Sequence, residues 1–196
     1  MQFNINNEEQ KYLLSLARET IAAKLEKRDP SYPKQPGGPE SNILKPCGAF
    51  VTLNLKDSDG NKNLRGCIGR MIATTPLEKT VKAMALESAF GDSRFPPISK
   101  KEFLGDSFPK VSIEISALSP LEPCVDPRSV IVGVHGIYLI HRGRSGVLLP
   151  QVPVEQGWDQ DEYLDYINKK AGLPPGSWDD PLAERFVFTA VVFGED

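Results

Sequence analysis

Apolar residues recur every three or four positions in three stretches of the chain, which is the spacing of helices that bury one face. The spacing predicts helices over about 8–27, 76–90 and 160–171. We expect the second helix to start with a capping box between Thr75 and Glu78, with Pro76 at its first helical position. Asp159, three residues before Glu162, is expected to cap the third helix.

Other stretches alternate between apolar and polar residues, as half-buried strands do. The clearest is 110–118, and 49–55 and 64–69 flank a turn cluster at 57–61 that predicts a β-hairpin. Two or three strands are expected over 130–149, with a tight turn at 142–146. A closing strand is expected over 185–193, and a short helical turn over 99–103.

The order of these elements decides the fold class. The strands follow one another through hairpins or long helix-bearing connections, without a regular strand–helix alternation. This order favours an α+β fold, a mostly antiparallel sheet flanked by helices, over a doubly wound fold. Residues 29–46 are rich in proline and glycine and predict an extended surface loop, Asp29 to Pro46. No strand–GxGxxG–helix or P-loop unit occurs, so the standard nucleotide-binding routes find no support.

The length and the charge of the chain limit its domain number, its partners and its location. A chain of 196 residues, with 40% hydrophobic and 25% charged residues, suits one domain with a larger and a smaller lobe. The formal net charge of −3 leaves room only for a local basic patch, so nucleic-acid binding is not indicated by charge. No apolar run approaches the roughly 18 residues of a membrane span, and residues 1–10 lack a signal core. We therefore expect a cytoplasmic protein that makes no membrane contact.

The cysteines and histidines argue against a disulfide framework and a metal site. Cys47, Cys67 and Cys124 show no CxxC spacing, and His135 and His141 lie six positions apart. A hairpin turn near Gly60 would place Cys67 opposite a residue near Val51, roughly 13 Å along the strand from Cys47. We expect no disulfide between them, no metal and no cofactor.

The hexapeptide from Leu64 to Gly69 carries the most specific candidate chemistry. Alternation along a strand would place Arg65 and Cys67 on one face, where Gly66 and Gly69 leave space for a ligand. Cys67 would be a nucleophile or ligand contact, and the Arg65 guanidinium would hold an anionic group. The alternative is a buried cysteine that packs as a small hydrophobe, with the arginine on a solvated face.

Further polar residues stand beside predicted strands and turns. Asp92 and Arg94 either line a pocket or pair within an ordered connection. Glu114, in the middle of a strand, needs a cationic partner if its face is covered, and Arg65 or Arg94 would supply it. His135 is a candidate general base or a structural turn residue, and Gln151 is a candidate for the rim of a pocket.

With these residues in this order, the sequence resembles the AMMECR-one family over about residues 8–193. The segments that carry the resemblance occur in order: 49–53, 64–69, Asp92 with 94–96, 114–116, 148–151, and Trp158 through 163–164 to 170–173. The intact Leu-Arg-Gly-Cys-Ile-Gly hexapeptide is the most specific of them. The resemblance implies an α+β protein of two lobes, without a settled activity. It also implies a pathway shared with a Memo-like protein and a radical-SAM enzyme, acting on RNA, a protein or a metabolite.

Three functional hypotheses follow. In the first, a small enzyme or enzyme subunit gathers Arg65, Cys67, Asp92, Arg94, Glu114 and His135 in a cleft between the lobes. Cys67 is then nucleophile or proton donor, the two arginines hold an anionic group, and Glu114 or His135 acts as base. In the second, the same residues form a non-catalytic adaptor surface for a protein or RNA. In the third, the hexapeptide is a folding nucleus.

Overall fold

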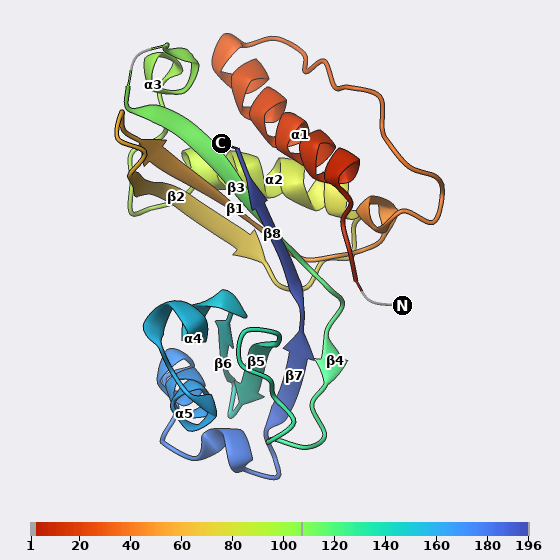
Figure 1. Cartoon of the computed structure of the whole chain (residues 1–196), viewed down its shortest axis with the longest axis vertical. Helices are drawn as coiled ribbons and strands as arrows, with labels where there is room; N and C mark the ends of the chain where they lie inside the picture. The colour runs from red at the N-terminus through yellow and green to blue at the C-terminus, as the bar shows by residue number, and fades with distance from the viewer. Residues whose placement is uncertain (1–2, 107, 196) are drawn as a thin grey trace. The chain divides into compact units, whose positions relative to one another are not determined.

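The computed structural model describes residues 3–106 and 108–195, and the chain divides into two compact units (Figure 1). Unit 1 comprises residues 1–118 and 191–196, and unit 2 comprises residues 119–190. Each unit contains a four-stranded sheet and its own helices. The α+β class, with a larger and a smaller lobe, is thereby confirmed. That both units form one domain stays a prediction.

The sheet of unit 1 has the strand order β2-β1-β3-β8. Its strands are β1 (Ala49–Lys56), β2 (Lys62–Arg70), β3 (Lys110–Leu118) and β8 (Ala190–Gly194). The predicted hairpin is confirmed, because β1 pairs with β2 in antiparallel register across the 57–61 turn. Strand β1 pairs with β3 on its other side, also antiparallel. The strand β2, which carries the hexapeptide, therefore forms an edge of the sheet.

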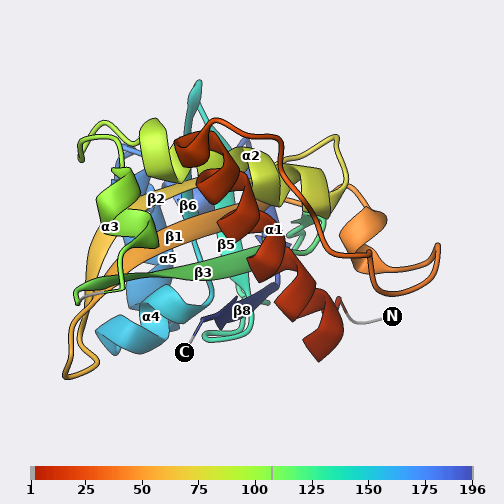
Figure 2. The ribbon, with the colours of Figure 1, turned by 90° about the horizontal axis from the view of Figure 1, so that it is seen from above.

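Helices cover one face of this sheet (Figure 2). They are α1 (Asn7–Glu26), α2 (Leu77–Phe90) and the short α3 (Lys100–Leu104), with a 3₁₀ turn at Asn42–Leu44 in the proline-rich loop. Apolar residues at helical spacing in α1 and α2 pack on alternate residues of the strands, such as Val51, Leu53, Ile113 and Ile115. The intervening residues of each strand consequently point to the second face, which we call the polar face.

The N-termini of α1 and α2 are capped in different ways. At α1, the Asn6 side chain accepts from the amides of Glu8 and Glu9, and the Glu9 carboxylate accepts from the Asn6 amide. The capping box expected at α2 is wrong, because the helix begins at Leu77 and Pro76 is its N-cap without a side-chain bond. The Glu78 carboxylate instead accepts a hydrogen bond from the Tyr12 hydroxyl of α1, at 3.0 Å.

Unit 2 has the strand order β4-β7-β5-β6. Its elements are β4 (Glu122–Pro123), β5 (Gly136–His141), β6 (Arg144–Leu148), α4 (Gln151–Gln156), α5 (Gln160–Lys170), a 3₁₀ turn at Ser177–Asp179 and β7 (Glu184–Phe188). The core contains Tyr163 and Trp178, both fully buried. Helix α5 starts with the predicted capping box of Asp159 and Glu162. Helix α4 was not expected, and the closing strand is divided at Thr189 between the two sheets.

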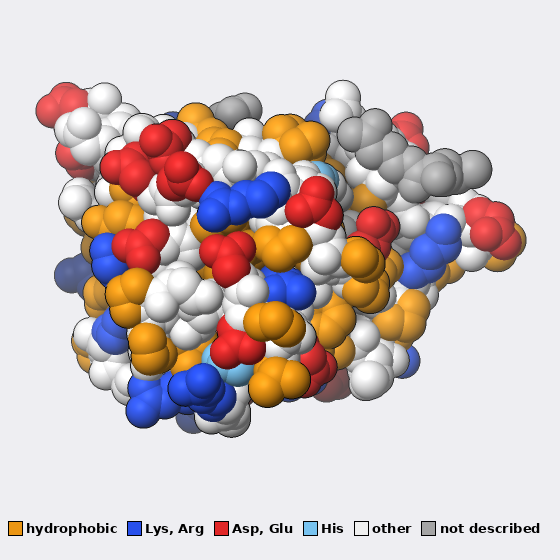
Figure 3. Space-filling view, turned by 90° about the horizontal axis from the view of Figure 1, so that it is seen from below, with side chains coloured by type: hydrophobic (Ala, Val, Ile, Leu, Met, Phe, Trp, Pro, Cys, Tyr) orange, Lys and Arg blue, Asp and Glu red, His pale blue; other side chains and the backbone are white. Residues whose placement is uncertain are grey.

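Charged side chains are dispersed over the face shown in Figure 3, where acidic and basic groups alternate with apolar ones. This distribution agrees with the small formal net charge of −3. Across 3–106 and 108–195, no helix is both long enough and apolar enough to span a bilayer.

Candidate functional site

A β-bulge in the hexapeptide determines where its side chains point. Gly66 pairs with Leu53, but the next residue of β1, Asn54, pairs with Leu64, so Arg65 is an extra residue in β2. An extra residue breaks the alternation of side chains along a strand. Simple alternation would place the Arg65 and Cys67 side chains on one face of the strand. Because Arg65 is the extra residue, alternation does not determine the direction of its side chain.

Arg65 is a buried structural residue in this geometry, with 7% of its surface exposed. Its guanidinium pairs with the carboxylate of Glu102 in α3 and donates to the carbonyl oxygen of Pro96 at 2.9 Å. These bonds tie the edge strand to α3 and to the connection before it. Arg65 is therefore poorly placed to hold a ligand beside Cys67.

Cys67 lies on the polar face. Its partner in the register is Thr52 of β1, and the Thr52 hydroxyl donates a hydrogen bond to the Cys67 Sγ at 3.3 Å. Thr52 in turn pairs with Glu114 of β3. Cys67, Thr52 and Glu114 thus form one cross-strand row, because residues paired in register point to the same face. Each of the three is half-buried.

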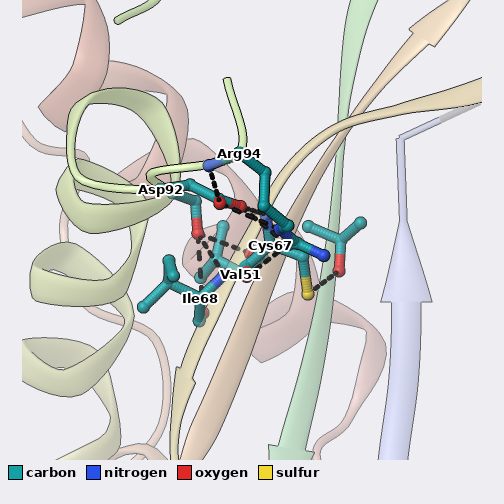
Figure 4. A network of polar contacts seen from close by, with 7 residues as sticks. Val51, Cys67, Ile68, Asp92 and Arg94 are labelled. Atoms are coloured by element: carbon teal, nitrogen blue, oxygen red, sulfur yellow. Dashed lines mark hydrogen bonds and ion pairs between the residues drawn. The ribbon is translucent and has the colours of Figure 1, made fainter. Parts of the chain in front are cut away.

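The Asp92 carboxylate binds the outer edge of β2 at the same residue (Figure 4). Asp92 follows α2, and its side chain is buried. It accepts hydrogen bonds from the Cys67 amide at 2.9 Å and from the Arg94 amide, Nε and Nη2 at 3.1, 2.9 and 2.7 Å. These bonds, above all those from the Arg94 side chain, hold the pKa of Asp92 well below its usual range.

Arg94 completes this network. Its Nη2 donates both to Asp92 and to the carbonyl oxygen of Cys67, the latter at 3.1 Å. The hydrogen bond with Asp92 raises the pKa of Arg94, so the guanidinium keeps its charge. About half of the side chain, 54%, is exposed. Asp92 and Arg94 therefore fix a positive group at the strand edge next to Cys67 and leave part of it open to solvent.

Ser88 of α2 supports the strand from the helix side. Its hydroxyl donates to the Val51 carbonyl at 2.6 Å and accepts from the Ile68 amide at 2.9 Å, so it joins β1 and β2 to the helix (Figure 4). Neither Ser88 nor Thr52 was singled out from the sequence. Ser88 could have been found as a polar residue within the buried stripe of α2. Thr52 could be found only from the register of β1 against β2, which places it opposite Cys67.

The two glycines of the hexapeptide have tight surroundings. A Cβ atom at Gly66 would lie 2.2 Å from the Ser88 carbonyl oxygen, and one at Gly69 would lie 2.1 Å from Cδ1 of the Phe50 ring. The space at both positions is therefore filled by the protein itself. Their role as ligand-binding glycines stays a prediction.

Glu114 lacks the partner that was expected for it. Arg65 pairs with Glu102 and Arg94 pairs with Asp92, and neither arginine forms an ion pair with Glu114 in the described part of the chain. Glu114 is thus a half-buried carboxylate on the polar face, in register with Thr52.

His135 and Gln151 belong to unit 2. The Nδ1 of His135 accepts from the Ile131 amide at 3.2 Å, which closes the turn before β5. The carbonyl oxygen of His135 accepts from the Tyr163 hydroxyl at 3.0 Å. These contacts favour the structural alternative for His135. Gln151 starts α4, and the roles of both residues in a shared cleft stay predictions.

The three thiols are free but differ in exposure. Cys47 and Cys124 are 3% and 5% exposed, whereas Cys67 is half-buried. Burial raises the pKa of Cys47 to about 11. Among residues 3–106 and 108–195, no group of three or more His, Cys, Asp or Glu side chains is arranged to hold a metal ion.

Comparison with known proteins identifies the family. The family model described as AMMECR1 matches residues 14–193. A protein of Thermococcus gammatolerans is 38% identical over 200 residues, covering 99% of this chain and 94% of that protein. A protein of Methanopyrus kandleri is 39% identical over 195 residues, covering 96% and 89%. The crystal structure of an uncharacterised protein from Pyrococcus horikoshii superposes with a TM-score of 0.81 at 36% identity, covering 99% of this chain and 95% of that one. On the strength of these matches and of the shared architecture, the chain belongs to the AMMECR1 family.

Proposed function

We propose that the chain is a thiol-dependent enzyme or enzyme subunit in which Cys67 attacks a substrate that carries an anionic group. One observation supports this most directly: the half-buried Cys67 thiol accepts a hydrogen bond from the Thr52 hydroxyl at 3.3 Å. This bond fixes the position of the sulfur on the polar face, and the thiolate is the nucleophilic form of cysteine.

Arg94 is the residue best suited to hold the anionic group. Asp92 fixes its guanidinium through Nε and Nη2, and Nη2 also reaches the Cys67 carbonyl. A guanidinium held in this way loses little side-chain entropy when it binds an anion. This role was expected for both Arg65 and Arg94, and the contacts favour Arg94 alone.

Glu114 is the candidate base. It shares the polar face with Cys67, with Thr52 between them in the register. For the thiol proton to reach the Glu114 carboxylate, the Thr52 hydroxyl turns so that it accepts the proton of the Cys67 S–H and passes its own to Glu114, which ends protonated. The class of reaction is covalent catalysis by sulfur: a C–S bond forms at an electrophilic carbon of the substrate, the bond from that carbon to a leaving group breaks, and Glu114 returns the proton to the leaving group.

Alkylation with a neutral and a charged reagent tests the thiol and the arginine together. In a Cys47→Ser, Cys124→Ser background, the rates of Cys67 modification by iodoacetamide and iodoacetate are measured by mass spectrometry. We expect Arg94→Gln to slow the anionic iodoacetate several-fold more than iodoacetamide, because it removes the positive charge beside the thiol. Arg94→Lys should preserve most of the preference.

Arg70 provides a matched control, since it lies on the same strand three residues away and is exposed. Arg70→Gln should leave the ratio of the two rates unchanged. Thr52→Val should slow both reagents, because sulfur loses its hydrogen-bond donor. The proposal fails if Cys67 in the wild-type chain reacts no faster than Cys47 and Cys124, or if Arg70→Gln and Arg94→Gln change the ratio equally.

The family resemblance also suggests a Memo-like protein and a radical-SAM enzyme as partners, with RNA, a protein or a metabolite as the modified molecule. Co-expression of the three proteins followed by affinity capture tests this. An enzyme subunit should keep its partners when Cys67 is replaced by serine but lose turnover. An adaptor should lose them on Arg94→Glu and be indifferent to Cys67→Ser.

A further inference from the structure

A pocket lies in unit 1, at the ends of β1 and β3 that are remote from the residues of the Cys67 row. Its volume is about 600 Å³, within the range of small-molecule sites. The side chains that characterise it are Arg18, Lys56, Phe103, Leu104, Phe108 and Lys110. None of these residues takes part in the network around Cys67.

A row of three lysines crosses the sheet at this pocket. Lys56 at the end of β1 pairs in register with Lys62 of β2 and with Lys110 of β3. Like charges directly opposite each other destabilise a sheet. Lysines on edge strands also prevent sheets from joining edge to edge, but this reason does not cover Lys56, since β1 is an interior strand.

Carboxylates do not neutralise this row in the described part of the chain. Lys56, Lys62 and Lys110 form no ion pair there. The neighbouring Asp57 carboxylate is directed into its own turn, where it accepts from the amides of Asp59 and Asn61, both at 2.9 Å. Among residues 3–106 and 108–195, the row is therefore a concentration of positive charge that no ion pair neutralises.

The remaining charges of the pocket are nearly balanced. Arg18 forms a two-bond ion pair with Glu195, whose Oε1 accepts from Nε at 2.6 Å, and its guanidinium lies over the Phe103 ring. Asp106 contributes one exposed negative charge to the lining. Lys56 and Lys110, with Lys62 beside them, thus leave a net positive charge at one side of the pocket.

Apolar surface lies next to these lysines. Phe108 is 55% exposed and Leu104 is 37% exposed, and both line the pocket. The Lys110 ammonium lies 5.5 Å from the centre of the Phe108 ring. Large exposed apolar side chains beside unpaired cations match a ligand that has an apolar body and an anionic end.

We propose that this pocket binds a small phosphate monoester with a ring-sized apolar body. Its phosphate contacts Lys56 and Lys110, and its body covers Leu104 and Phe108. The position is independent of the proposed thiol chemistry, because Lys56 lies four residues beyond Thr52 on β1, roughly 13 Å along the strand. A ligand here would regulate the protein or anchor a distant part of a substrate.

Phenyl phosphate is the test ligand, with phenol as its uncharged counterpart. Titration of the full chain, followed by amide chemical shifts, should show that phenyl phosphate shifts the resonances of residues 56, 104–105 and 110. We expect Lys56→Gln with Lys110→Gln to weaken binding at least ten-fold. Asp106→Asn should tighten it a few-fold, since it removes the negative charge of the lining.

Lys34→Gln with Lys79→Gln is the matched control, because both lysines are exposed and lie outside the pocket. This pair should leave the affinity unchanged. Unfolding in urea should show that Lys56→Gln with Lys110→Gln does not lower stability, since it removes like charges from the row. The proposal is overturned if phenol binds as tightly as phenyl phosphate, or if the control pair weakens binding as much as the pocket pair. Alkylation of Cys67 reports separately on the proposed function.

Discussion

The carbonyl oxygen of Ser88 occupies the place where a side chain on Gly66 would begin, since a Cβ atom there would lie 2.2 Å away. This contact joins the backbone of α2 to the edge strand β2. Two residue pairs further along the β1–β2 register, the Ser88 hydroxyl bonds both Val51 and Ile68. The glycine is therefore required for the close approach of the helix to the strand that carries Cys67.

Gly66→Ala should destabilise unit 1 strongly. The clash involves two backbones rather than a flexible side chain, so relief requires α2 to move and the Ser88 bonds to break. We expect a loss of at least roughly 2 kcal/mol in the free energy of unfolding, measured in urea. Gly38→Ala is the control, because a Cβ at Gly38 meets nothing within 4 Å. Equal effects of the two substitutions would contradict the packing argument.

Gly69→Ala should behave differently, because its clash is with the side chain of Phe50. A Cβ at Gly69 would lie 2.1 Å from Cδ1 of that ring. We expect Gly69→Ala alone to destabilise by roughly 1–3 kcal/mol, and Phe50→Ala to remove most of this effect in the double variant. A double-mutant cycle of urea unfolding measures the coupling. Additive single effects would show that the ring does not determine the need for glycine.

Periodicity predicted the long helices and the hairpin because their apolar faces are buried against one core. Residues 7–26 and 110–118 follow the helical and strand patterns closely. The capping box at Thr75 failed because the motif is local, whereas Glu78 is engaged by Tyr12, 66 positions earlier. Helix α4 lacked a detectable signal, since it has six residues and contains Pro153.

Some residues of the candidate site could be selected from the sequence, but its geometry could not. The hexapeptide and Asp92 with Arg94 were both selected from the sequence, and the structure brings them together at Cys67. Strand alternation could not reveal that Arg65 is a bulge residue. Thr52 could not be found either, because its importance depends on the register of β1 against β2.

Asp92→Asn should weaken unit 1 and detach Arg94 from the strand edge. Asparagine can keep one bond to the Cys67 amide, but it loses the charge that holds the guanidinium. We expect a loss of roughly 2 kcal/mol in unfolding free energy at pH 7. Asp29→Asn, at an exposed loop position, should change it by less than roughly 0.5 kcal/mol.

The difference in unfolding free energy between the wild type and Asp92→Asn should depend on pH in a definite direction. The pKa of Asp92 is lowered in the folded state from the ordinary value of 3.8. Its contribution is therefore fully present above pH 3.8 and is lost as the pH falls through the folded pKa. The stability difference between wild type and Asp92→Asn should be constant from pH 5 to pH 7 and shrink below pH 4. A difference that grows in acid would contradict the network.

The stabilising contribution of Tyr12 is lost as the pH rises, whereas that of Asp92 is lost as the pH falls. Burial, together with the hydrogen bond to Glu78, raises the pKa of Tyr12 from 10.0 to about 12. The neutral hydroxyl is thus favoured by folding, and its contribution is complete below pH 10 and is lost as the pH rises through 12. We expect Tyr12→Phe to reduce stability by roughly 1 kcal/mol at pH 8, and this deficit to shrink toward pH 11.

Difference absorbance at 295 nm between wild type and Tyr12→Phe isolates the titration of this one hydroxyl. Glu78→Gln is the matched variant, because glutamine still accepts the 3.0 Å hydrogen bond but carries no charge. The ionisation of Tyr12 should then move down from about 12 without returning fully to 10.0, since burial, the larger cause, persists. Ionisation near 10 in the wild-type chain would show that the α1–α2 contact does not shield this hydroxyl.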